Sequence, residues 1–201
     1  LTWSPDSRRI GFISSPNRTA SSRIYAVDAA GGAPENLLGE WQYEPDQVNW
    51  LPDGRIAFSS SIGGRTALMI LTPGIKAPAE VLSGRRRLSG FDFDAEGKVV
   101  AYVATSMTKP TELFVAGSDG QGERQLTRFN DKLNAEIAWS DTERFTYRSV
   151  GNLEIEGWLM KPFGYDAAKK YPVVLYIHGG PHSAYGENWF DEFQNLAATG
   201  M

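Results

Sequence analysis

A segment repeated about every 44 residues, and one apolar run that ends in a glycine turn, predict a mostly β chain. The repeats are typical of a partial β-propeller with about three four-stranded blades. The apolar run, its turn and the amphipathic segment after it are typical of the first strands and first helix of an α/β domain. We therefore expect two domains, the C-terminal blades of a propeller over 1–138 and the N-terminal part of an α/β domain over 139–201.

Two landmarks with one period define the repeat. Its opening, WSPDSRRI from Trp3, returns as WLPDGRI from Trp50 and more loosely as FDAEGKV from Phe93. The second landmark is a short strand, which reads RIYAVD, ALMILT and ELFVAG in successive repeats. Pro-Asp-Gly and Pro-Asp-Ser favour tight turns, and the segments after them are apolar and β-branched or aromatic. Each repeat therefore predicts four antiparallel strands, as in a propeller blade. Because propellers typically have at least four blades, we expect further blades before Leu1.

The C-terminal part is predicted to begin with a hairpin. Arg144–Ser149 and Leu153–Met160 have strand patterns on either side of the turn Val150–Asn152. A polar connection, 161–170, leads to Val173–Ile177. This run is unbroken, apolar and rich in β-branched residues, which predicts a central parallel strand buried on both faces.

The turn after this strand carries the candidate chemistry. His178, Gly179 and Gly180 follow the strand directly, at the carboxyl edge where open α/β sheets bind ligands. Glycines tolerate positive φ and let backbone N–H groups approach a substrate. Two such amides can face a developing oxyanion, although the same residues also occur in a plain strand-ending turn.

A helix is predicted after the turn. Asn188 can cap its N-terminus with Asp191 three residues on, and Gly200 supplies a C-terminal stop. Apolar residues recur at helical spacing on one face: Trp189, Phe190, Phe193, Leu196 and Ala197. Strand, turn and helix make half of a βαβ unit. We therefore expect the next parallel strand to follow Met201, and the chain to be a piece of a longer protein.

Composition narrows the classes of function. The chain has 201 residues, 41% of them hydrophobic, which suffices for one sizeable core or two small ones. A net charge of −4 argues against nucleic acid or an anionic membrane as the main partner, and we interpret Arg85–Arg87 as a solvated loop. The absence of cysteine excludes thiolate catalysis in this chain. The only two histidines adjoin no carboxylate cluster, so neither a metal site nor a cofactor is expected.

The blade openings, the strand EGWLMKP from Glu156, the segment YPVVLYIHGGP from Tyr171 and the aromatic helix together resemble the prolyl oligopeptidase family of serine peptidases. The similarity is greatest to its acylaminoacyl-peptidase and dipeptidyl-peptidase-like branch, and it covers essentially the whole chain. It implies an α/β-hydrolase domain whose propeller restricts access, so that short peptides reach the site.

The resemblance also assigns candidate roles to single residues. It implies that the turn from His178 to Gly180 contributes to the oxyanion hole, through the Gly180 backbone N–H. His178 is expected to shape the turn. His182 is a candidate for substrate or loop contacts rather than the triad base, because that histidine follows the serine and the acid in these hydrolases. Glu40 and Glu44, in an aromatic loop, could meet a substrate amine; the alternative is that they are solvated loop charges.

The departures from the family pattern concern the catalytic triad. No Gly-x-Ser-x-Gly motif occurs, and both histidines precede the place where the nucleophile should come. None of the triad can be assigned, so we expect the chain alone to be inactive although its parent acts by acyl transfer to serine. Two other functions stay open, a propeller that binds a ligand or protein and a carboxylesterase- or lipase-like hydrolase.

The sequence also bounds partners and location. No run is long enough to span a bilayer, so we expect a soluble protein, cytoplasmic or periplasmic. Short peptides are the expected substrates. A half-built sheet would expose an unpaired strand edge, which invites a second copy of the chain.

Overall fold

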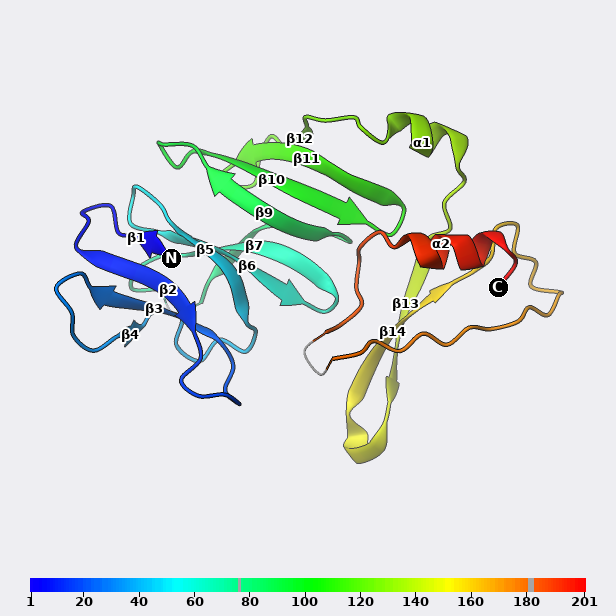
Figure 1. The fold of residues 1–201 in the computed structure, drawn as a ribbon, viewed down its shortest axis with the longest axis horizontal. Helices are drawn as coiled ribbons and strands as arrows, with labels where there is room; N and C mark the ends of the chain where they lie inside the picture. The colour runs from blue at the N-terminus through cyan, green and yellow to red at the C-terminus, as the bar shows by residue number, and fades with distance from the viewer. Residues whose placement is uncertain (76, 181–182) are drawn as a thin grey trace.

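The computed structural model describes residues 1–75, 77–180 and 183–201, and it contains three consecutive four-stranded antiparallel sheets (Figure 1). The first sheet comprises β1 (Thr2–Trp3), β2 (Arg9–Ser14), β3 (Arg23–Asp28) and β4 (Glu35–Asn36). The second comprises β5 (Pro45–Trp50), β6 (Ile56–Ile62), β7 (Arg65–Leu71) and β8 (Ala79–Leu82). The third comprises β9 (Arg87–Phe93), β10 (Val99–Ser106), β11 (Lys109–Gly117) and β12 (Arg124–Gln125). Within each sheet the strands pair in chain order, so the predicted blades are confirmed.

The Pro-Asp turns join the first two strands of the first and second blades, as the sequence predicts, and an Asp-Ala-Glu-Gly turn at 94–97 does so in the third. Asp53 Oδ1 accepts a hydrogen bond from the backbone N–H of Arg55, 3.0 Å away, and Gly54 takes a φ of +86°. In the first blade the equivalent left-handed position is Ser7, with a φ of +58°. A side chain at such a φ is strained, so the glycine of the second blade suits this turn better.

The hydrophobic core lies between blades rather than inside one. Successive residues of β6 and β7 point to opposite faces of the middle blade, because side chains alternate along a strand. Phe58 and Met69 face the first blade, where they pack with Ile24 and Leu38. Leu68 belongs to the cluster on the opposite face, which contains these residues of the second and third blades: Leu51, Ala57, Ile70, Leu82, Leu88, Phe91, Val100, Tyr102, Ala104 and Ala116. Each blade therefore needs its neighbour to bury its apolar side chains.

A short helix and a hairpin follow the third blade. The helix, α1 (Asp131–Glu136), has no buried residue and was not predicted from the sequence. The predicted hairpin is confirmed: β13 (Thr142–Arg148) pairs with β14 (Glu154–Met160) around a 3₁₀ turn at Val150–Asn152. Gly151 and Asn152 take φ values of +71° and +61°, so this three-residue connection uses two left-handed positions, one of them occupied by glycine.

The prediction of a central strand at Val173–Ile177 is wrong for this structure. The segment is irregular, and no strand among the described residues runs beside it to supply a hydrogen-bonded ladder. The apolar pattern predicted burial on both faces, yet Val173, Leu175 and Ile177 are 83%, 80% and 75% exposed. Apolar and β-branched residues favour a strand only where partner strands cover them.

The predicted helix is present as α2 (Asp191–Ala198), with its N-terminus corrected. Its N-cap is Phe190 rather than Asn188, whose side-chain amide instead donates to the Trp189 carbonyl oxygen, 3.3 Å away. The C-terminal stop is confirmed. Gly200 has a φ of +91°, and its N–H and that of Met201 bond back to the last turn in the Schellman pattern. No helix in the described part of the chain is long and apolar enough to cross a membrane.

Candidate functional site

The candidate site is the turn formed by His178, Gly179 and Gly180. Gly180 has a φ of +146°, in the region that favours glycine, so this position needs a residue without a Cβ. Gly179 does not share that constraint, and a Cβ built on it would meet nothing within 4 Å. The His178 ring places Nδ1 3.1 Å from the Gly179 carbonyl oxygen. This contact within the turn agrees with a role for His178 in shaping the backbone.

An aromatic cluster supports the turn from α2 and from the loop before it. Tyr185 lies at its centre, with its ring centroid 6.2 Å from that of His178 and 5.2 Å from that of Phe193. Tyr176 packs edge-to-face on both Tyr185 and Phe193. Its hydroxyl donates to Glu192 at 2.8 Å, and this hydrogen bond raises the pKa of Tyr176. The cluster therefore ties the segment that enters the turn to the helix that follows it.

The other candidate residues do not join this turn. Glu40 and Glu44 are exposed, and within the described ranges no hydrogen bond or ion pair connects either carboxylate to residues 178–180. Their exposure agrees with the alternative that they are solvated loop charges. His182 lies outside the described residues. No cluster of three or more potential metal-ligating side chains occurs in the described part of the chain.

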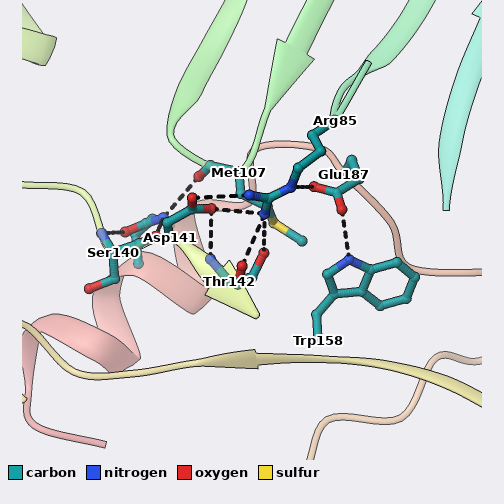
Figure 2. Close-up of polar contacts among 8 residues, drawn as sticks. Arg85, Met107, Ser140, Asp141, Thr142, Trp158 and Glu187 are labelled. Carbon is teal, nitrogen blue, oxygen red and sulfur yellow. Dashed lines mark hydrogen bonds and ion pairs between the residues drawn. The ribbon is translucent and has the colours of Figure 1, made fainter. Parts of the chain in front are cut away.

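The structure reveals a polar junction that the sequence did not predict (Figure 2). Arg85, in the connection between β8 and β9, extends between two acidic groups of the C-terminal part. Its guanidinium bonds Asp141 at 3.2 and 3.3 Å and the Thr142 carbonyl oxygen at 3.0 Å. On the other side its Nε lies 3.6 Å from Glu187 Oε2. Arg85 lies in a loop and its side chain is 57% exposed, as the sequence suggested, but its polar partners were not predicted.

Glu187 is the buried member of this junction. Its side chain is only 5% exposed, and a buried carboxylate needs hydrogen-bond donors and a countercharge. The Trp158 indole N–H donates to Glu187 Oε1 at 3.1 Å, and Arg85 supplies the charge. The field of Glu187, reinforced by Asp141, raises the pKa of Arg85, so the guanidinium stays charged.

Backbone contacts bring the same segment close to the second blade. The N–H of Glu187 donates to the Gly64 carbonyl oxygen at 2.7 Å. A Cβ built on Gly186 would overlap that oxygen, and one built on Gly64 would overlap the Trp158 ring. Both positions therefore need glycine for close approach. The Gly63-Gly64 pair predicts a hairpin turn from sequence, but no local signal predicts what packs against it.

A second connection links α2 to the third blade. Gln194 is 8% exposed, and its amide Nε2 donates to the carbonyl oxygens of Met107 and Ser140, each at 2.9 Å. Its Oε1 accepts from the Ser140 N–H at the same distance. In addition, the Trp189 N–H donates to the Thr105 hydroxyl at 3.2 Å. The helix after the turn is thus bonded directly to the hairpin between β10 and β11.

The arrangement defines a class of architecture. Three consecutive blades pack face to face, and a hairpin, a His-Gly-Gly turn and an amphipathic helix follow them, as at the end of a β-propeller and the start of an α/β-hydrolase domain. Comparison with known proteins agrees with this class.

No protein-family model matches the chain. The uncharacterized peptidase YuxL of Bacillus subtilis (strain 168) is 31% identical over 179 residues, which are 88% of this chain and 26% of that protein. Dipeptidyl-peptidase 5 of Arthroderma otae is 25% identical over 203 residues, covering 93% of this chain and 27% of that protein. The structure of the Pyrococcus horikoshii acylaminoacyl peptidase matches with a TM-score of 0.81 and 28% identity, over 97% of this chain and 30% of that one.

The chain is thus a relative of the peptidases of the prolyl oligopeptidase family, in its acylaminoacyl-peptidase and dipeptidyl-peptidase-like branch. It spans about a quarter of the length of the curated relatives that it matches.

Proposed function

We propose that the whole protein is a serine peptidase that cleaves short peptides by acyl transfer, and that this segment supplies one backbone donor of its oxyanion hole. The observation that carries the proposal is the His-Gly-Gly turn, with Gly180 at a φ of +146°, in a chain that resembles peptidases along nearly its full length. The domain division at 138/139 belongs to the same proposal.

The chemistry follows from the geometry of such a turn. A serine oxygen attacks the peptide carbonyl carbon, and negative charge develops on the carbonyl oxygen as the tetrahedral intermediate forms. The Gly180 N–H would donate a hydrogen bond to this oxyanion, and the residue after the serine would supply the second donor. Collapse of the intermediate breaks the C–N bond, and the triad histidine passes the serine proton to the leaving amine. Water then releases the acyl group by the same route.

This segment lacks the serine and the triad base, so we propose that it does not turn over substrate alone. A chain without the nucleophile keeps at best the weak catalysis of an oxyanion hole. The propeller blades are proposed to restrict access to the site, so that short peptides are preferred over folded proteins.

The proposal is tested with the full natural protein and a matched set of chromogenic substrates. These are an acyl-blocked amino acid anilide, a dipeptide anilide with a free N-terminus, and a simple acyl ester. We expect turnover of at least one anilide. Turnover of the ester alone would favour a carboxylesterase, and no turnover of any substrate would contradict the proposal.

A Gly180→Ala variant tests the turn itself. The added Cβ strains a backbone φ of +146°, so the amide should leave its productive position. Loss of one oxyanion donor typically lowers kcat by about 10²–10³-fold. Gly164→Ala is the matched control, because Gly164 also has a positive φ, +71°, with nothing within 4 Å of a built Cβ. Equal kcat values for the two variants would argue against the assigned role.

A further inference from the structure

The segment that leaves the candidate turn is held by the propeller blades rather than by the C-terminal part alone. Gly186 and Glu187 lie against Gly64, in the turn between β6 and β7, and Glu187 also pairs with Arg85 of the connection between β8 and β9. Trp158 of β14 closes the arrangement from the hairpin side (Figure 2). We call these residues, Gly64, Arg85, Trp158, Gly186 and Glu187, the junction clamp.

The junction clamp reaches the turn through one side chain. Tyr185 precedes Gly186 directly, and its ring contacts those of His178 and Tyr176. Displacement of Gly186 would therefore move the aromatic ring that packs on the first residue of the turn. Tyr185 is partly buried and His178 is exposed, so the contact between their rings is the link through which such a shift would reach the turn.

The charge arrangement explains why an acidic residue suits position 187. The side chain is nearly fully buried, and it faces one indole N–H and one guanidinium. Removal of the carboxylate would take away the acceptor of the indole N–H, and among the described residues Arg85 would keep Asp141 as its acidic partner. Neither glycine has room for a Cβ, because one on Gly186 would overlap the Gly64 carbonyl oxygen and one on Gly64 would overlap the Trp158 ring.

We infer that Glu187 is a positioning residue, through which the propeller fixes the geometry of the turn from His178 to Gly180. The inference rests on the proposed function for its catalytic consequence. It adds to that function a direct mechanical role for the blades, beyond restricting access. Glu187 itself touches no reacting atom.

The test compares Glu187→Ala, Glu187→Gln and Glu154→Ala in the full natural protein. Glu154 is the matched control, an exposed carboxylate at the start of β14 that pairs with exposed Arg148. The first measurement is rapid hydrogen–deuterium exchange of the peptide from His178 to Asn188. We expect exchange to accelerate about tenfold in Glu187→Ala, less in Glu187→Gln because its amide oxygen still accepts from Trp158, and not at all in Glu154→Ala.

The second measurement separates positioning from a merely structural role. An oxyanion donor acts mainly in the transition state, so its misplacement should lower kcat about tenfold and leave KM within about twofold. The affinity for a peptide aldehyde, which forms a tetrahedral adduct, should fall in parallel with kcat, while a product peptide binds unchanged. Glu187→Gln should recover part of both losses.

The outcomes distinguish the two claims. Absence of turnover in the unmodified protein would contradict the proposed function. The hydrogen–deuterium exchange measurement would then still test whether the junction clamp holds the segment from His178 to Asn188. Exchange in Glu187→Ala equal to that of the unmodified protein would overturn the clamp. Faster exchange with unchanged kcat and aldehyde affinity would overturn the positioning role.

Discussion

The backbone N–H of Glu187 lies 2.7 Å from the carbonyl oxygen of Gly64 and donates a hydrogen bond to it, although the two residues belong to different parts of the chain. Gly64 occupies a hairpin turn of the second blade, and Glu187 follows the candidate turn by seven residues. The contact joins the propeller to the segment that leaves the site. Substitutions at this contact and around it should therefore change the stability of the protein by measurable amounts.

Gly186→Ala should destabilise the junction. The new Cβ would overlap the Gly64 carbonyl oxygen, and backbone cannot move aside as a flexible side chain does. Overpacking of this kind costs about 1–3 kcal/mol. Urea unfolding measures the loss, and Gly179→Ala serves as the stability control because its Cβ meets nothing within 4 Å. Equal unfolding midpoints for the two variants would contradict the close approach.

Gln194→Ala should weaken the attachment of α2 to the third blade. The variant removes three hydrogen bonds and leaves the Ser140 N–H and two carbonyl oxygens without these partners. A buried donor or acceptor left without a hydrogen-bond partner costs up to about 3 kcal/mol. We therefore expect the free energy of unfolding to fall by about 2–3 kcal/mol. Asn195→Ala changes an exposed neighbour on the same helix and should cost less than about 0.5 kcal/mol. Similar costs for both variants would refute the role of Gln194.

Arg86 and Glu123 should show a coupled contribution to stability. They form two hydrogen bonds, at 2.8 and 2.6 Å, and their side chains are 18% and 32% exposed. We expect a double-mutant cycle with alanine to give a coupling of about 1–2 kcal/mol. The exposed pair of Arg148 and Glu154 is the control and should give less than about 0.5 kcal/mol. A coupling no larger than that of the control would show that burial adds nothing.

Glu112 should make stability depend on acidic pH. Burial raises the pKa of this carboxyl, but hydrogen bonds from Thr127 and Asn130 outweigh burial, so its pKa in the folded protein lies below the ordinary value. The ionised form therefore stabilises the fold above the unfolded-state pKa of about 4.3, and the contribution is lost as pH falls through the folded pKa. Glu112→Gln should be destabilised near neutral pH and approach the unmodified protein in acid. A difference in unfolding free energy that does not change between pH 7 and pH 3 would contradict this.

The fold was predictable from local sequence patterns wherever other parts of this chain bury the apolar side chains of an element. The Pro-Asp turns at Asp6 and Asp53 placed the blade hairpins, and the alternation in β6 and β7 agrees with burial against two neighbouring blades. The hairpin turn at Gly151 was equally clear. The structure of Val173–Ile177 was predicted wrongly, because an apolar run becomes a strand only beside partner strands.

The site was predictable in part for a similar reason. The turn residues His178 to Gly180 are adjacent in sequence, and the positive φ of Gly180 agrees with the turn expected there; their part in catalysis stays a prediction. The junction of Arg85, Asp141 and Glu187 joins residues that are far apart in the chain. The charge of a residue also does not reveal its environment, because the same Arg-Arg-Arg run contains Arg87, which is exposed, and Arg86, which packs over the Tyr102 ring. The tertiary structure is needed to tell which residue each of these three arginines contacts.

The central claim is that the turn from His178 to Gly180 forms part of the oxyanion hole of a serine peptidase. It is tested most directly by labelling the full natural protein with a fluorophosphonate and identifying the modified peptide by mass spectrometry. We expect a single labelled serine, located after Met201 in a strand-to-helix turn, with labelling slowed by Gly180→Ala. No labelling of any serine would contradict the claim.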